Sequence, residues 1–278
     1  ECETEAVSSD GFFNGPFPES CDLVVGDQVT FTDGTTIRTH TVRNLAITAV
    51  DEMANTVSGT ADPSAEVYVW QHEPGEQPRF DADENGDWFA DLNGYYDIRP
   101  GMGGRAEIRD EFGNGTAVDW YIPDPHFTVF PEWEWFDGYE WPDGTVSITV
   151  AGKELVCDTD AVSLDGFFNG LFPEGCDVVV GDQVTFSDGT TIRTHTVRNL
   201  AITAVDDVAD TVSGTADPDA VVHAWIHEVD GSEMELVAED GTWLADFSSF
   251  GLEEGTCGRV EIRDDQRNST AVDWCVVP

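Results

Sequence analysis

Residues 27–42 read DQVTFTDGTTIRTHTV. Thr, Val and Ile surround the dipeptide Asp33-Gly34, and β-branched residues on both sides of an Asp-Gly pair predict two antiparallel strands joined by a tight turn. The same stretch returns at residues 182–197 with a single change, Thr32 against Ser187. The sequence therefore predicts one β-hairpin at two places in the chain.

The hairpin lies inside a longer internal repeat. Residues 11–50 and 166–205 match at 36 of 40 positions, at an offset of 155. The sequence TAVDW at 116–120 returns at 270–274, so the match runs nearly to the C-terminus. A repeat of this length predicts a tandem array of domains. Near-copies in series are typical of spacers, stalks, fibres and multivalent binders.

The first copy is shorter than the second at its N-terminal end. Glu1 aligns with Val156, so residues 125–155 have no counterpart before Glu1. We expect the first module to lack strands that the second has, which leaves an open sheet edge. A neighbouring subunit would fill this edge by strand addition and generate a head-to-tail filament. The alternative is a longer array that is cut within a module.

Strand signals dominate the whole chain. Runs rich in Thr, Val and Ile are separated at short intervals by Gly, Pro and Asn-Gly, and no helical period exceeds two turns. We expect an all-β fold of tandem immunoglobulin-like β-sandwich modules in a two-fold internal repeat. The predicted pieces are an incomplete β module A at 1–44, a sandwich B at 45–122, a β module A′ at 123–199 and a sandwich B′ at 200–278.

Charge and composition limit the partners. The net charge is -44, from 12 basic and 56 acidic residues, and such a surface repels nucleic acid and anionic lipid. Because 40% of the residues are hydrophobic and Trp occurs 9 times, we expect folded domains with an acidic surface. There is no apolar run near the length of a membrane helix, so no membrane insertion is expected. Without an initiator Met or signal peptide, the chain is expected to be a mature exported product or part of a longer one.

The six cysteines fit an oxidising compartment. The repeat makes Cys2 equivalent to Cys157 and Cys21 equivalent to Cys176, so one bridge in each copy is the simplest pairing. The two remaining cysteines lie equally far from residue 266, within a predicted turn, and would face each other in a hairpin. The predicted disulfides are Cys2–Cys21, Cys157–Cys176 and Cys257–Cys275; free thiols or a zinc site are the alternatives.

Two stretches carry a family resemblance. Residues 56–67, TVSGTADPSAEV, and 211–221, TVSGTADPDAV, resemble the signature of bacterial immunoglobulin-like domains of secreted adhesins and surface fibres. Residues 85–88 and 113–118 fit later hairpins of the same family. The resemblance covers modules B and B′, and it implies a sandwich fold and an extracellular, cell-surface location.

Residues 81–86, DADENG, match the first half of a calcium loop, D-x-D-x-N-G. Oxygens at alternate positions can converge on one ion, which makes Asp81, Asp83 and Asn85 candidate ligands. Leu92 stands where the loop would carry its bidentate Glu, and an Asn-Gly hairpin turn is the alternative.

The resemblance also implies calcium at the domain joints, where linker carboxylates hold the ion in that family. The candidates by position are Asp51, Asp62 and Asp119 in the first copy and Asp206, Asp217 and Asp273 in the second. A structural Ca²⁺ cofactor would relieve the self-repulsion of the acidic chain.

Two further motifs suggest that the chain carries or binds sugars. Asn114 and Asn268 begin N-x-[ST] sequons at equivalent positions, predicted to be exposed hairpin tips, and are candidate glycosylation sites. Residues 127–141 read FTVFPEWEWFDGYEW, and a single strand there would place Trp133 and Trp135 on one face. With Trp141 they are candidate glycan-binding residues; packing in the core is the alternative.

Catalytic motifs are lacking: the chain has no G-x-S-x-G, H-E-x-x-H or P-loop sequence. The repeat equivalents His40 and His195 are expected to be structural surface residues, and no enzyme is predicted. We expect a structural subunit of an extracellular bacterial fibre or surface stalk, with copies of itself in a filament and glycans as partners. A glycan-binding adhesin fragment is the alternative.

Overall fold

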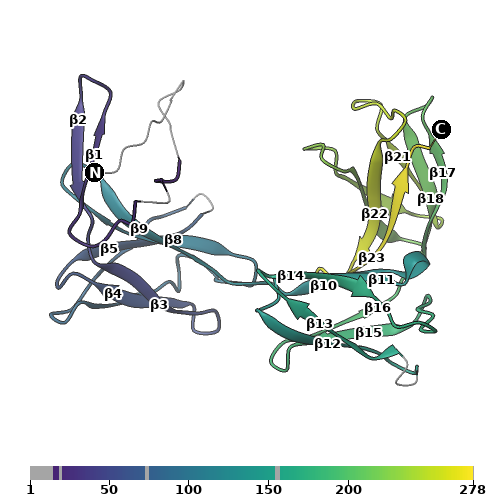
Figure 1. Ribbon diagram of the computed structural model, residues 1–278, viewed down its shortest axis with the longest axis horizontal. Helices are drawn as coiled ribbons and strands as arrows, with labels where there is room; N and C mark the ends of the chain where they lie inside the picture. Colours follow the sequence, from purple (N-terminus) through teal and green to yellow (C-terminus); the bar gives the residue numbers. More distant parts are fainter. Residues whose placement is uncertain (1–14, 19–20, 73–74, 154–156, 278) are drawn as a thin grey trace. The chain divides into compact units, whose positions relative to one another are not determined.

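The computed structural model describes residues 15–18, 21–72, 75–153 and 157–277 (Figure 1). In these ranges the chain forms strands β1 to β23 and one short 3-10 helix, so the prediction of an all-β fold is confirmed. No helix in them is long and apolar enough to cross a membrane. The chain divides into two compact units, residues 1–122 and 123–278, and each is described by itself.

The first unit contains a hairpin and two larger sheets (Figure 1). The hairpin pairs β1 (Gln28–Thr32) with β2 (Ile37–Thr41). One sheet has the order β3-β4-β7, made of β3 (Leu45–Asp51), β4 (Thr56–Ala61) and β7 (Asp87–Asp91). The other has the order β6-β5-β8-β9, made of β5 (Glu66–Gln71), β6 (Arg79–Asp81), β8 (Gly103–Arg109) and β9 (Gly115–Tyr121).

The second unit repeats this plan with more strands, in three sheets. The four-stranded sheet β13-β12-β15-β16 contains β12 (Gly144–Val150), β13 (Thr159–Ser163), β15 (Gln183–Ser187) and β16 (Ile192–Thr196). The three-stranded sheet β17-β18-β21 contains β17 (Leu200–Asp206), β18 (Thr211–Ala216) and β21 (Thr242–Asp246).

The third sheet of this unit has seven strands in the order β14-β11-β10-β23-β22-β19-β20. Its members are β10 (His126–Phe130), β11 (Trp135–Tyr139), β14 (Phe167–Leu171), β19 (Ala220–Ile226), β20 (Met234–Ala238), β22 (Cys257–Arg263) and β23 (Ser269–Cys275). The helix η1 (Pro131–Trp133) links β10 to β11.

The hairpin predicted from residues 27–42 is confirmed in both copies. In the first, Phe31 opposes Arg38 and Thr32 opposes Ile37, and the second has the same register. The side chain of Asp33 accepts backbone hydrogen bonds from Thr35 (2.8 Å) and Thr36 (2.6 Å), which closes the turn.

Alternating burial explains the sandwich. β4 and β5 bury every second residue, as period-2 strands with one face on a core do. The buried side chains form three separate core clusters, within residues 57–120, 127–197 and 200–276. The first and last join the two facing sheets of a sandwich, and the middle one fills the four-stranded sheet and its neighbours.

Each sheet of the two sandwiches contains a glycine that directly opposes a tryptophan on the adjacent strand. The pairs are Gly59–Trp88, Gly104–Trp120, Gly214–Trp243 and Gly258–Trp274. A Cβ on any of these glycines would come within 2.7 Å of the indole ring. The indole therefore lies over bare backbone, and the four pairs place large aromatic rings in the two sandwich cores.

Candidate functional site

A buried histidine ties β16 to the sandwich that follows it in the second unit. His195 is 2% exposed; its Nδ1 lies 3.0 Å from a carboxylate oxygen of Asp264, and its Nε2 lies 2.9 Å from Oγ1 of Thr270. The same Oγ1 accepts a hydrogen bond from the backbone N–H of Arg198 at 2.9 Å. Because a carboxylate can only accept, the Nδ1–H of His195 donates to Asp264. We call this arrangement the histidine lock.

The first unit has the same lock. His40 on β2 places Nδ1 3.2 Å from Asp110 and Nε2 2.9 Å from Oγ1 of Thr116, which also accepts from the backbone N–H of Arg43 at 2.9 Å. The expectation that the two histidines are surface residues is wrong, because each ring is enclosed between a hairpin and a sandwich loop. Their structural character follows from satisfied buried hydrogen bonds.

The lock carboxyls have lowered pKa values. The pKa of Asp110 is lowered to about 2, chiefly by the hydrogen bond from the Asn114 amide and also by that from His40, against partial burial, which raises it. In the second unit, burial raises the pKa of Asp264, but hydrogen bonds from the lock histidine and from a neighbouring amide outweigh it and lower the pKa. Both carboxyls are therefore charged at neutral pH.

Arginine side chains contact the carboxylates that the sequence assigns to calcium at the joints. Arg43 binds Asp62, and at the equivalent place Arg198 Nε lies 2.7 Å from Asp217. Asp119 and Asp273 are paired in the same way, with Arg105 at 2.6 Å and Arg259 at 2.7 Å respectively. At these four positions a guanidinium supplies the positive charge that calcium was expected to supply.

The remaining joint candidates cap turns. Asp51 accepts a backbone hydrogen bond from Ala54 (2.8 Å), and Asp206 accepts from Val208 (3.0 Å) and Ala209 (2.9 Å). Calcium needs several converging oxygens, and no group of three or more His, Cys, Asp or Glu side chains converges in the part of the chain that the structure describes. These donor sets do not fit a calcium site.

The loop at residues 81–86 has the geometry of a turn. Oδ1 of Asp83 accepts from the backbone N–H groups of Asn85 (2.8 Å) and Asp87 (2.9 Å), and Gly86 has a φ of 91°. The hydrogen bonds from Asp87 and Asn85 lower the pKa of Asp83. Asp81 belongs to β6, where it opposes Glu66 of β5. The geometry favours the hairpin turn over the calcium loop.

Two of the predicted disulfides are present, Cys157–Cys176 and Cys257–Cys275. Cys257 directly opposes Cys275 across β22 and β23, as the hairpin argument requires. Cys2 lies outside the described residues, and with it the predicted Cys2–Cys21 bridge.

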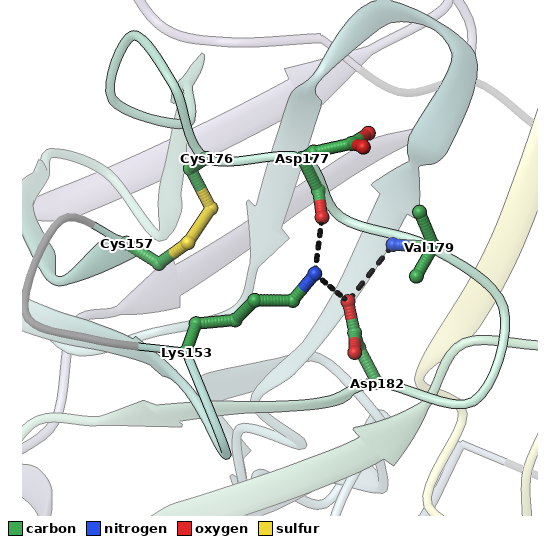
Figure 2. Close-up of a disulfide and its surroundings, with 6 residues drawn as sticks. All are labelled: Lys153, Cys157, Cys176, Asp177, Val179 and Asp182. Atoms are coloured by element: carbon green, nitrogen blue, oxygen red, sulfur yellow. Dashed lines mark hydrogen bonds and ion pairs between the residues drawn. A yellow bond between two sulfur atoms is a disulfide. The ribbon is translucent and has the colours of Figure 1, made fainter.

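Next to the first of these bridges lies Lys153, the only lysine of the sequence (Figure 2). Its ammonium donates to the backbone carbonyl of Asp177 at 2.6 Å and lies 3.0 Å from the Asp182 carboxylate. The same carboxylate oxygen accepts from the backbone N–H of Val179 at 2.9 Å (Figure 2). These contacts hold the loop between the bridge and β15.

The sequon prediction is wrong for Asn268. This side chain is 0% exposed, and its Nδ2 donates to both carboxylate oxygens of Asp264, at 3.3 and 3.2 Å. A glycan on it would have to break the hairpin turn. Asn114 is half-buried, and its Nδ2 donates to Asp110 at 2.9 Å. Glycosylation of Asn114 stays a prediction, which an intact-mass measurement tests.

The predicted tryptophan face does not form. Trp133 ends η1, Glu134 takes a left-handed φ of 51°, and Trp135 begins β11, so the two rings do not share a strand face. Trp141 is 1% exposed and donates from Nε1 to the carbonyl of His126 at 2.9 Å. Only Trp133 of the three is mostly exposed, at 55%. The reading as one continuous strand overlooked the turn that begins at Pro131.

In the second unit, the segment from β10 to β12 covers two strand edges. β10 pairs in parallel with β23, where Thr128 opposes Ser269 and the two hydroxyls lie 2.9 Å apart. β12 pairs antiparallel with β15, where Ile148 opposes Phe186. Phe127 stacks on Phe186 with ring centroids 4.0 Å apart. We call this arrangement the closed seam.

The equivalent strands of the first unit are far more exposed. Among the described residues β1 pairs with β2 alone, and β9 lies at the edge of its sheet. Phe31 is 46% exposed, whereas its counterpart Phe186 is 0% exposed. Ala117 on β9 is exposed, whereas its counterpart Ala271 on β23 is 1% exposed. We call β1, β2 and β9 the open seam.

A polar cleft of about 350 Å³ lies beside the closed seam. Its lining residues are His126, Thr128, Tyr139, Trp225, Glu233, Arg259, Glu261, Arg263, Arg267 and Ser269. The Arg263 guanidinium lies over the Trp225 ring, 5.8 Å from its centre, and contacts Glu233 at 3.0 Å. Burial, with the nearby Asp137 carboxylate, raises the pKa of Tyr139 to about 12. The cleft combines aromatic rings with paired charges.

The lock and the arginine pairs were not predicted from the sequence. A usable signal was present: His, Asp and Thr recur together at 40, 110, 116 and at 195, 264, 270, and Arg43–Asp62 recurs as Arg198–Asp217 at the same spacing. Residues that recur together in both copies indicate a shared contact. Because these residues lie far apart in the sequence, the contact was not recognised from it.

Comparisons with known proteins place the chain in no family. No family model matches it, and no curated protein matches it. One similar solved structure comes from work on cell-surface retention of a 1.5-MDa bacterial ice-binding adhesin, with 18% identity over 81% of this chain and 91% of that chain, at a TM-score of 0.21. The BSP domain of a biofilm-associated protein has 11% identity over 76% of this chain and 56% of that chain, at a TM-score of 0.23.

E. coli alpha-2-macroglobulin has 10% identity over 79% of this chain and 19% of that chain, at a TM-score of 0.20. Because all three TM-scores are far below 0.5, these similarities carry no weight for fold or function.

Proposed function

We propose that this chain is a structural part of an extracellular bacterial fibre or surface stalk, built from β-sandwich modules that are locked to one another in series. The observation that carries the proposal is the histidine lock, present in both copies between a hairpin and the sandwich after it. A joint held by hydrogen bonds that are shielded in part from water resists bending, which a spacer requires.

Two further features support a stiff module. In the second unit, one seven-stranded sheet runs from β14 to β20 and so spans both core clusters of that unit. Two disulfides staple the same unit, and such bonds persist in oxidising, extracellular surroundings. The acidic surface keeps such a module soluble and discourages non-specific contact with anionic partners.

Assembly belongs to the same proposal. Chains are joined head to tail, and the open seam of the first unit is an edge at which another strand can add. Because such a contact is heterologous, it extends and does not close.

Electron microscopy of the purified full chain over a range of concentrations tests this proposal, with calcium and again with chelator. Regular filaments would support head-to-tail assembly, and filaments that disappear with chelator would revive the calcium prediction. Separate particles at every concentration would contradict self-assembly of this chain.

A second candidate function is glycan recognition, moved from the predicted tryptophan face to the polar cleft. Trp225 and Tyr139 line it, and so do the charged, hydrogen-bonding groups of Arg263 and Glu233. Screening on a glycan array tests it. A ligand that is lost with Trp225→Ala and retained with Trp133→Ala would favour recognition, whereas an array without signal would contradict it.

A further inference from the structure

The polar cleft of the second unit gathers basic side chains in a very acidic chain. Lys and Arg total 12 against 56 acidic residues, yet three arginines, Arg259, Arg263 and Arg267, line this one cleft of about 350 Å³. Ligand sites range over about 300–1,000 Å³, so a cleft at the small end of this range fits a ligand of monosaccharide size. Which ligand it takes depends on which of the three charges is available to bind it.

Two of the arginines are held closely by carboxylates of the protein. The Arg259 side chain is 17% exposed, and its Nε lies 2.7 Å from a carboxylate oxygen of Asp273. Arg263 is bound by Glu261, and its Nη1 lies 3.0 Å from Glu233. Charge-assisted pairs of this kind are the strong ones, and they satisfy both guanidinium groups within the protein.

Arg267 is held less closely. Its side chain is 52% exposed, and its two ion pairs are longer, 3.4 Å to Asp124 and 3.6 Å to Glu140. The lining residues of the cleft include Arg267 and neither of these two acids. Both contacts are made by Nη1, whereas a guanidinium has five N–H donors. Arg267 can therefore bind a further carboxylate from the side of the cleft.

The backbone at residue 267 points to a role for the arginine side chain. Arg267 has a left-handed φ of 65°, which costs free energy in a residue that carries a Cβ. The equivalent residue of the first unit is Gly113, with a φ of 80°, and β8 and β9 pair on either side of that turn without an arginine in it. The turn therefore does not require Arg267, and its presence is better explained by what its side chain binds.

We propose that the cleft binds a sugar with one carboxylate group, of the uronic acid class, and that Arg267 binds this carboxylate. The inference rests on glycan recognition in the cleft, the second candidate function. Planar guanidinium and carboxylate groups pair through two parallel hydrogen bonds. Glu233, whose side chain is 52% exposed, lines the same cleft and accepts hydrogen bonds from the hydroxyl groups of the sugar.

The net charge of the chain limits this ligand to a single charge. At -44 the protein repels polyanions, which disfavours a polyuronate or a heavily sulfated chain. A lone carboxylate at Arg267 is affected mainly by its immediate neighbours, because in about 0.1 M salt charges beyond about 10 Å are largely screened. One acidic sugar in an otherwise neutral glycan fits both conditions.

The test is an NMR titration of the full chain in about 0.1 M salt, followed through the amide shifts of β22 and β23. The probes are D-glucuronate, its uncharged amide D-glucuronamide, and D-glucose. We expect glucuronate to bind on the order of tenfold or more tightly than either neutral sugar, because only its carboxylate makes a charge-assisted pair.

Two variants locate the charge that matters. Arg267→Gly should reduce glucuronate binding to the level of the amide without lowering the melting temperature, because the first copy has Gly113 at the same place. Arg79→Gln removes an equal charge from a side chain that is 66% exposed in the first unit, and it should leave glucuronate binding unchanged.

Equal affinity for glucuronate and its amide, glucuronate binding that Arg267→Gly leaves unchanged, or no shift with any probe would overturn the inference. The outcomes separate it from the functions proposed above. Neutral sugars that bind as tightly as glucuronate, and are lost with Trp225→Ala, would keep glycan recognition and remove its preference for an acid. Absence of binding by all three probes would count against both, whereas the structural role is tested by microscopy and stands or falls separately.

Discussion

Trp88 lies directly across from Gly59, with its indole ring in the space that a side chain on residue 59 would need. A Cβ there would be 2.7 Å from the ring and 1.9 Å from the carbonyl oxygen of Ala46. The pair thus couples three strands, since Ala46 lies on β3, Gly59 on β4 and Trp88 on β7.

Gly59→Ala should destabilise the first unit by about 1–3 kcal/mol, because overpacking forces backbone and ring apart. Urea unfolding with tryptophan fluorescence measures this. Gly15→Ala is the matched control, because a Cβ at Gly15 meets nothing within 4 Å. Equal stability of the two variants would show that the Trp88 ring moves aside freely.

His195→Ala should destabilise the second unit by about 1–3 kcal/mol, since Asp264 and Thr270 lose their buried partner. The free energy of unfolding, followed by a probe in the second unit, measures the loss. His227→Ala is the control, because His227 lies in the same unit and is exposed. A loss no larger than the control's would remove the lock as a structural device.

Stability should fall in acid through the lock carboxyls. The pKa of Asp110 is lowered from 3.8 to about 2 in the folded chain, so its contribution is present above pH 3.8 and is lost as the pH falls towards 2. The lowered pKa of Asp264 acts in the same direction. Thermal unfolding from pH 7 to pH 2 measures this, and Asp110→Asn should flatten the acid limb for the first unit. An unchanged acid limb in that variant would contradict the assignment.

Replacing the Cys257–Cys275 bridge by the residues of the first copy, Cys257→Gly with Cys275→Tyr, should leave the second unit folded but about 3 kcal/mol less stable. The first unit has Gly103 opposite Tyr121 at these positions, so the backbone accepts the pair. Denaturant unfolding measures the loss. Peptide mapping without reductant checks all three predicted pairings, and failure of the variant to fold would make the bridge essential.

Arginine pairing at the joints predicts that Ca²⁺ and Mg²⁺ raise the melting temperature equally, by screening the net charge of -44. Thermal unfolding with each ion, and with chelator, measures this. A rise specific to Ca²⁺ would restore calcium as a structural cofactor. Arg198→Met should destabilise the joint with either ion, because it leaves Asp217 without its partner.

Local patterns sufficed for much of the fold. The Asp-Gly hairpins, the strand-rich composition and the internal repeat led to the observed all-β architecture, because turn chemistry and period-2 burial act over a few residues. The pairing of Cys257 with Cys275 across two strands was predicted because both lie at the same distance in sequence from one turn.

Assignments that depended on what lies nearby in space were less reliable. Asn268 was predicted to lie at an exposed hairpin tip, yet its amide is buried against Asp264. Trp133 and Trp135 were predicted to share one strand face, but the turn that begins at Pro131 separates them. The joint carboxylates looked free for a cation, yet Arg43 and Arg198 contact two of them.

The strands and hairpins could be predicted from the residues alone, because short-range backbone preferences set them, and the two near-copies are visible in the sequence itself. Long-range packing set the rest: His40 and His195 form locks, and among the described residues nearly identical strands are more exposed in the first unit than in the second. Burial depends on which other segments are present to pack, and identical residues such as Phe31 and Phe186 therefore have different surroundings.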